Sequence, residues 1–202
     1  MLESIIRLSK GDHGTTWCEP ALSALDDWHD DKIPHDIFRM LNEGFAEMFF
    51  SNFVIFVEGP EDIAYLQAYW RAKNKSPLPH IIPVGGKENM LKPIKLAREF
   101  NINCFAVFDA DREEASHEGN KRLTELLGID ESESFSQPVI EEKFAVWPDK
   151  IRETVASELN GFNIASLDKK PLKIAAEVTR VVGEGATSPS LDAIWSKIET
   201  RV

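Results

Sequence analysis

The sequence FVIFVEGPED, residues 53–62, decides the fold together with CFAVFDAD, residues 104–111. Each stretch is a run of β-branched and aromatic residues without polar alternation, and each ends in acidic residues. Such runs predict strands that are buried on both faces, as in a parallel sheet. Ligands bind at the carboxyl ends of the strands in open α/β sheets. We therefore expect an active site among the acids that end these runs: Glu58, Asp62, Asp109 and Asp111.

Strands and helices alternate outward from these two stretches. A helix over 60–73 is expected after the first strand, because Pro60 suits the first helical position. A strand at 80–84 leads through two glycines into a helix over 87–100, and the third strand covers 103–109. This β-α-β-α-β order predicts a right-handed, mostly parallel α/β sheet flanked by helices. Later elements are expected as a helix within 113–127, a strand at 144–147, and helices at 149–159, 171–182 and 190–198.

The first fifty residues are expected to form a lead-in to the sheet. Ser4–Lys10 and Thr15–Glu19 predict a short hairpin around a glycine-containing loop. Ile37–Phe50 carries apolar residues at helical spacing, which predicts an amphipathic helix whose aromatic end packs on the sheet. We divide the chain into this lead-in over 1–50, a catalytic α/β domain over 51–160 and a C-terminal helical extension over 161–202.

The composition, with 43% hydrophobic and 28% charged residues, is typical of a soluble globular protein. No apolar run reaches the roughly 18 residues of a membrane span, and the N-terminus lacks the features of a signal peptide. Cys18 and Cys104 do not make a disulfide framework, so a reducing cytoplasm is the expected location. The net charge of −11 lies mostly in the first 62 residues. Since this charge repels nucleic acid, a nucleic-acid function requires basic patches, bound metal or basic surface supplied elsewhere.

The four acids predict a site for divalent cations. If the strands at 53–58 and 103–109 are neighbours, their terminal carboxylates converge and repel one another unless cations are bound. Asp109 and Asp111 are two residues apart, so their side chains point the same way if the extended backbone continues. Oxygen ligands favour Mg²⁺ or Mn²⁺, and two such ions about 3.5–4 Å apart can clamp a phosphodiester in line. Any one of these acids alone is more simply a turn residue, and the helix dipole also explains Asp62.

The order of these motifs resembles the TOPRIM domain of topoisomerases, primases and the OLD (overcoming lysogenization defect) family of nucleases. In that domain a glutamate follows the first strand and Asp-x-Asp follows a later one, as Glu58 and Asp109-Ala110-Asp111 do here. Asp62 matches an acid that the OLD family adds four residues after the glutamate, with Asp in place of the commoner Glu. The VGGK turn at 84–87 and the lead-in at 42–59 are also similar to the OLD type.

The resemblance implies an endonuclease or nickase that hydrolyses phosphodiester bonds of DNA with two Mg²⁺ or Mn²⁺ ions, held by Glu58, Asp62, Asp109 and Asp111. Lys170, before a proline, matches a lysine of OLD nucleases that would stabilise charge on the scissile phosphate. Lys169 is the alternative register, and an ordinary basic residue before a helix is the competing interpretation. The family also carries a further acid in this region, for which the candidates are Glu141, Glu142 and Glu153.

OLD proteins carry an ABC-type ATPase ahead of the TOPRIM region, yet these 202 residues contain no GxxxxGK[ST] loop. The opening at 4–17 is similar to the end of such an ATPase. We therefore expect the C-terminal nuclease portion of a longer chain, with ATP as a cofactor only if that domain exists. The implied partners are a DNA substrate, further copies of the chain joined through the missing domain, and a helicase.

Two other functions stay open. One is a primase-like or RNA-processing TOPRIM enzyme; a topoisomerase is disfavoured because Tyr65 and Tyr69 are the only tyrosines and share one predicted helix. The other is a dimerisation or binding module that retains the acids without turnover. Several cations, Lys87 among them, are explained equally well as phosphate contacts or as a solvated helix face. The five histidines lack zinc spacing.

Overall fold

The computed structural model of the chain describes residues 7–11, 14–18, 45–111, 118–129, 135–168 and 170–201. Near the N-terminus, β1 (Arg7–Gly11) and β2 (Gly14–Cys18) form an antiparallel hairpin with Gly11 opposite Gly14. The predicted hairpin is thus confirmed, although the two glycines belong to the strands rather than to the loop.

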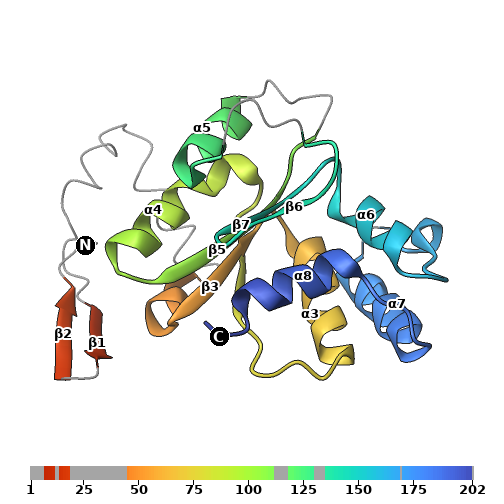
Figure 1. Cartoon of the computed structure of the whole chain (residues 1–202), viewed down its shortest axis with the longest axis horizontal. Coiled ribbons are helices and arrows are strands. Elements are labelled where there is room, and N and C mark those ends of the chain that lie inside the picture. The colour runs from red at the N-terminus through yellow and green to blue at the C-terminus, as the bar shows by residue number, and fades with distance from the viewer. Residues whose placement is uncertain are drawn as a thin grey trace.

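A five-stranded sheet forms the centre of the fold (Figure 1). Its strands, in spatial order, are β4 (His80–Pro83), β3 (Phe53–Val57), β5 (Asn103–Asp109), β7 (Phe144–Trp147) and β6 (Val139–Ile140). The first four are mutually parallel, and β6 runs antiparallel to β7. β3 and β5 are neighbours with Val57 opposite Val107, and all of β3 is buried. The predicted class, a mostly parallel α/β sheet flanked by helices, is confirmed.

Helices cover both faces of the sheet (Figure 1). One face carries α3 (Pro60–Ala72), α6 (Ile151–Glu158), α7 (Pro171–Gly183) and α8 (Pro189–Ile198). The other face carries α4 (Leu91–Glu99), α5 (Glu118–Leu127) and the 3-10 helix η2 (Phe45–Phe50). Because side chains alternate along a strand, Ile55 of β3 packs in the first core and Phe56 in the second.

Two predicted helices differ from the structure. Of the helix expected over 37–50, residues 45–50 form η2, whose Phe45 ring stacks on Phe56 with centroids 5.9 Å apart; residues 37–44 lie outside the described residues. The expected packing of this aromatic end on the sheet is confirmed. The helix expected over 87–100 divides into the 3-10 helix η3 (Lys87–Asn89) and α4. Pro93 explains the division, because it has no N–H to continue one helix through this point.

The C-terminal helices share a core with the sheet domain. The Trp70 indole of α3 donates to the Leu191 carbonyl oxygen at 3.2 Å, and its ring meets that of Trp195 edge-on with centroids 5.4 Å apart. The backbone N–H of Ser188 donates to the Tyr69 hydroxyl at 2.9 Å. The division of the chain at residues 50 and 160 stays a prediction. In the described parts of the chain, no helix has the length and apolar character that crossing a membrane requires.

Candidate functional site

The acids that end β3 and β5 meet at what we call the carboxyl edge, where β3, β5 and β7 end at Val57, Asp109 and Trp147. The Asp109 N–H donates to Oε1 of Glu58 at 2.7 Å. The Oδ1 atom of Asp109 accepts from the N–H of Ile151, the first residue of α6, at 3.0 Å. Backbone donors thus hold two carboxylates from neighbouring strands against each other.

Asp62 lies in the first turn of α3, and its carboxylate accepts from the Gly59 N–H at 2.8 Å. This bond is the carboxylate half of a capping box, in which an acid three residues into a helix satisfies the backbone before it. Only 9% of Asp62 is exposed. Asp62 therefore caps the start of α3, and it also lies close enough to Glu58 for the Glu58 charge to raise the pKa of Asp62.

Asp109 and Asp111 were expected to point the same way only if the extended backbone continued, and it does not continue. β5 ends at Asp109, and Asp111 adopts a left-handed conformation with φ of 47°, which Asp tolerates better than most residues. Its Oδ2 atom lies 2.6 Å from Nζ of Lys87, which also donates to the Asp109 carbonyl oxygen at 3.2 Å. The premise of a continuing extended backbone was wrong, so the two carboxylates take different partners.

Lys87 is placed differently from both sequence interpretations, a phosphate contact and a solvated helix face. Its side chain is 5% exposed, so it belongs neither to a solvated helix face nor to a surface that phosphates reach from outside. The Gly85-Gly86 turn positions it: both N–H groups donate to the Glu58 carbonyl oxygen, at 2.9 and 3.0 Å. Gly86 has a φ of 117°, and a Cβ there would lie 2.9 Å from the Glu88 carboxylate. A lysine directly after a glycine pair that ends a buried strand was the available signal.

The acids at the carboxyl edge are poorly disposed to carry charge. Burial raises the pKa of Asp109 to about 8, and the neighbouring charges of Glu58, Asp62 and Asp111 add to the rise. Burial raises the pKa of Asp62 to about 7, and burial also raises the pKa of Glu58. Backbone N–H donors to each of these carboxylates act in the opposite direction. Divalent cations would remove this penalty, because a nearby positive charge favours the ionised form.

The donor set fits Mg²⁺ or Mn²⁺, since every candidate ligand is a carboxylate oxygen. As the side chains are arranged, no three Asp, Glu, His or Cys residues among those described form a group ready to hold a metal. Asp109, Asp62 and Glu58 are turned to backbone N–H groups, and Asp111 is turned to Lys87. Metal binding here therefore requires some carboxylates to exchange these partners for the cation.

The candidates for a further acid fall at different ends of the sheet. Glu141 and Glu142 precede β7, and β7 runs parallel to β5, so they lie at the opposite end from Asp109. Four strand residues separate the two ends, roughly 10 Å or more at 3.3 Å per residue. Glu153 lies in the first turn of α6, two residues after Ile151. Asp149, half-buried between β7 and α6, also lies at the carboxyl edge. It follows a buried strand as the other acids do, so the same sequence rule points to it.

Two cations other than Lys87 are relevant. Lys170 is exposed and precedes α7; its described hydrogen bonds are backbone ones, to Leu167 and from Ile174. Lys169 lies outside the described residues. Arg152, the second residue of α6, has a buried Nε atom with no hydrogen-bond partner in the described parts of the chain. Its charge acts on Tyr65 of α3, as do those of Glu61 and Asp62, so Arg152 lies near the same tyrosine as these two acids.

A parallel sheet with a glutamate after one central strand and Asp-x-Asp after the adjacent one defines a TOPRIM domain. Residues 49–111 match the family model described as "Overcoming lysogenization defect protein-like, TOPRIM domain". This part of the chain is an OLD-like TOPRIM domain, which confirms the resemblance.

One solved structure, the "C-terminal region of the Burkholderia pseudomallei OLD protein", aligns over 76% of this chain and 100% of that chain. The sequence identity is 17% and the TM-score 0.45. The comparison with curated proteins gave no match.

Proposed function

We propose that this protein is a divalent-metal-dependent endonuclease of the OLD type that hydrolyses phosphodiester bonds in DNA. The observation that carries the proposal is the hydrogen bond from the Asp109 backbone N–H to the Glu58 carboxylate, which brings together the acids that follow two neighbouring strands. The OLD-like TOPRIM match over residues 49–111 supports the same conclusion, since TOPRIM domains generally use divalent metals.

In this proposal Glu58, Asp62, Asp109 and Asp111 hold two Mg²⁺ or Mn²⁺ ions. The raised pKa values of three of these acids support it, because they show an excess of buried acid with too little positive charge. When bound, the ions would supply activation of a water molecule and stabilisation of the leaving oxygen. The α6 backbone orients Asp109, and the Gly59 N–H orients Asp62.

Lys87 pairs with the Asp111 carboxylate and donates to the Asp109 carbonyl oxygen at the end of β5. We therefore assign Lys87 a positioning role. Lys170 is proposed to contact the scissile phosphate, as the family resemblance implies. Arg152 competes for this role, because its buried Nε lacks a partner in the described residues and its charge acts on Tyr65, the same residue on which Asp62 acts. Lys170→Gln and Arg152→Gln distinguish the two: loss of the phosphate contact lowers kcat while the affinity for Mn²⁺ stays unchanged.

The test of the main proposal is nicking of supercoiled plasmid in Mg²⁺, Mn²⁺ or EDTA. Asp109→Asn keeps the shape and the acceptor for the Ile151 N–H but removes the charge, so we expect the metal-dependent rate to fall at least about 100-fold. Glu142→Gln is the matched control, because it neutralises an acid at the opposite end of the sheet. Equal nicking by the wild type and Asp109→Asn would overturn the proposal.

A structured RNA and a primer-synthesis assay, run in parallel with the plasmid, test the RNA-processing and primase-like alternatives. If RNA is turned over in the presence of metal and the plasmid is not cleaved, the substrate is RNA and the proposed metal site still holds. Dependence on ATP, self-association through an ATPase domain and a helicase partner remain proposals for a longer parent chain.

The non-catalytic module is favoured by one observation: Lys87 and backbone donors already give each carboxylate a partner. A metal-free protein satisfied in this way can serve as a binding or dimerisation domain. Calorimetric titration with Mg²⁺ and Mn²⁺ decides, since absence of binding at millimolar concentrations supports the module and contradicts the nuclease.

A further inference from the structure

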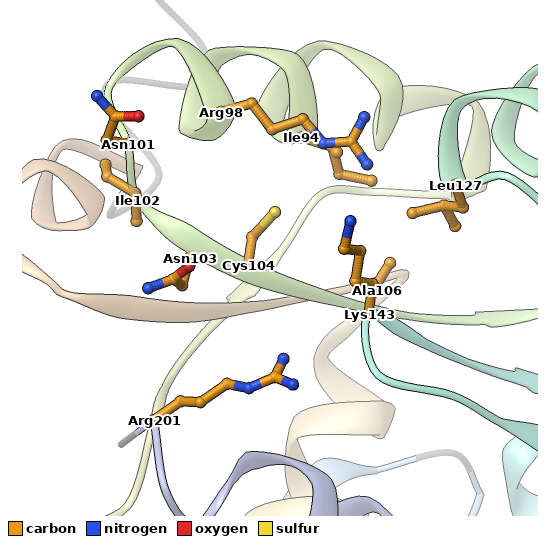
Figure 2. A pocket seen from close by; sticks show the side chains of 10 residues that line it. All are labelled: Ile94, Arg98, Asn101, Ile102, Asn103, Cys104, Ala106, Leu127, Lys143 and Arg201. Carbon is orange, nitrogen blue, oxygen red and sulfur yellow. The ribbon is translucent and has the colours of Figure 1, made fainter.

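A pocket of about 360 Å³ lies at the end of β5 remote from the acids (Figure 2). We call it the amino-edge pocket; its charged lining is Arg98 of α4, Lys143 before β7 and Arg201 after α8. Figure 2 shows the Lys143 and Arg98 side chains extending toward each other, with Cys104 of β5 to one side of them and Arg201 reaching in from the C-terminal end. Three segments far apart in sequence therefore bring cations to one cavity.

The charge of this pocket is opposite to that of the chain. The chain has a net charge of −11, whereas the lining within the described residues includes three cations and no acid. The Lys143 side chain has no hydrogen bond or ion pair in the described parts of the chain, and its backbone carbonyl oxygen accepts a 3.0 Å bond from the Ala106 N–H. Lys143 thus brings an exposed, unpaired ammonium to the pocket.

The two arginines are oriented by neighbours and keep donors for a ligand. Arg98 donates one N–H to the Leu126 carbonyl oxygen at 3.1 Å. Arg201 pairs with Glu142, whose other oxygen is 2.7 Å from Nζ of Lys197. Glu142, which is not part of the lining, therefore offsets the positive charge of Arg201. Arg98, Lys143 and Lys197 leave the surroundings cationic even after Glu142 and its exposed neighbour Glu141 are counted.

We propose that the amino-edge pocket binds a phosphate-bearing small molecule of about mononucleotide size. Pockets for small ligands span roughly 300–1,000 Å³ and combine apolar walls with a few placed polar groups. Here Ile94 and Leu127 supply apolar wall, and Asn101 and Asn103 supply amide groups. Guanidinium groups bind phosphate oxygens through paired N–H donors. The phosphate would lie between the cationic side chains, and the remainder of the ligand against the apolar wall.

This site is separate from the proposed metal centre. It adjoins Asn103 and Cys104 at the start of β5, whereas Asp109 ends that strand. The lining reaches along β5 as far as Ala106, and the three residues from there to Asp109 span roughly 10 Å. Binding at this pocket does not involve the acids, so experiments can disprove ligand binding here without disproving the nuclease activity, and the reverse.

Cys104 supplies a direct reporter, because the chain has one other cysteine, Cys18. In a Cys18→Ser background, the rate of Cys104 modification by a thiol-reactive disulfide is measured with AMP, inorganic pyrophosphate or adenosine. We expect millimolar AMP or pyrophosphate to slow the reaction severalfold and adenosine to leave it unchanged. Equal protection by adenosine, or no protection by any probe, would overturn the proposal.

The variant Lys143→Gln is expected to abolish protection by AMP, whereas Lys121→Gln, an exposed lysine of α5 outside the pocket, keeps it. Circular dichroism and calorimetric titration with AMP separate lost binding from misfolding. Asp109→Asn is expected to retain AMP binding, which distinguishes failure of this site from failure of the nuclease proposal. Protection by a short oligonucleotide but not by AMP would assign the cations to a DNA backbone and overturn a small-molecule site.

Discussion

The two ends of strand β5 carry opposite charges. At the carboxyl edge, Asp109 and Asp111 meet Glu58 and Asp62, whereas at the amino edge Arg98 and its basic neighbours surround the start of the strand. The acids are half-buried or buried, and burial raises the pKa of Glu58, Asp62 and Asp109, while Arg98 and Lys143 are exposed. Ionising the buried acids at the carboxyl edge therefore costs free energy that a bound cation can offset. The exposed cations at the amino edge carry no such cost.

Helix direction explains the difference. In a parallel α/β sheet, helices begin at the carboxyl edge and end near the amino edge, and helix N-termini favour anions while C-termini favour cations. The N–H of Gly59, directly before α3, donates to Asp62, and the N–H of Ile151, the first residue of α6, donates to Asp109. Arg98 lies in the last turn of α4, and Lys197 in that of α8. The contrast therefore follows from the topology, and the predictions below test it.

The largest expected effect is on stability, from Lys87→Met. The substitution removes a buried ammonium and leaves Asp111 and the Asp109 carbonyl oxygen without this donor. Breaking a buried ion pair on one side costs about 3 kcal/mol, measured here as the free energy of unfolding by urea in EDTA. Saturating Mn²⁺ should reduce the loss, since the cation replaces the missing charge. The exposed Lys121→Met is the control; the same loss in EDTA and Mn²⁺ would show that Lys87 acts by packing alone.

The next effect concerns which acid completes the metal site. Asp149→Asn and Glu153→Gln each neutralise an acid at the carboxyl edge, and loss of an outer partner of a metal site typically costs about 10- to 100-fold in affinity. We expect Asp149→Asn to weaken Mn²⁺ binding in calorimetry by such a factor, because Asp149 is half-buried and lies two residues after the end of β7, at the same edge as Glu58. Glu153 is exposed and serves as the comparison. A larger loss in Glu153→Gln would reverse the assignment.

A pH effect of at least about 1 kcal/mol is expected in the metal-free protein. Asp62 and Asp109 have pKa values of about 7 and 8 when folded, above those of ordinary carboxyls in an unfolded chain. The folded state then holds more protons than the unfolded state between about pH 4 and pH 8, so stability falls as the pH rises through this window.

Thermal unfolding from pH 5 to pH 8.5 in EDTA measures this slope. The Asp109→Asn variant has no carboxyl group that titrates at this position, so its stability should depend less steeply on pH. Added Mn²⁺ should restore stability most at high pH, where the carboxylate ligands are ionised. Identical slopes for the wild type and Asp109→Asn would contradict a protonated Asp109 in the metal-free fold.

The sequence alone predicted the parts of the fold that depend on local pattern. The buried runs at β3 and β5 were found because unbroken apolar stretches are visible in a short window, and the acids at their ends followed from strand direction. The assignment of Glu58, Asp62, Asp109 and Asp111 as metal ligands stays a prediction, and the structure adds that Glu58 and Asp109 are joined by a hydrogen bond.

What the sequence missed depends on contacts between segments distant in the chain. Lys87 is buried only because β4 lies beside β3, which brings the Gly85-Gly86 turn after β4, and Lys87 with it, against Asp111. The left-handed backbone at Asp111, which separates its side chain from that of Asp109, has no signal in the alternation of a strand. In contrast, the position of Glu142 was open to prediction, since a residue that precedes a parallel strand lies at the amino edge.

The smallest effect, and the sharpest test of the contrast between the two edges, is expected from Glu142→Gln. Glu142 is exposed and pairs with Lys197 and Arg201, so its loss should lower the thermal midpoint only slightly, as for most surface ion pairs. Added salt should erase even this difference, because exposed charges are screened. Plasmid nicking and Mn²⁺ affinity should not change, since Glu142 lies at the opposite end of the sheet from Asp109. Freeing Arg201 should instead tighten pyrophosphate binding at the amino-edge pocket. A loss of nicking comparable to that of Asp109→Asn would place Glu142 in the metal site and refute the separation of the two edges.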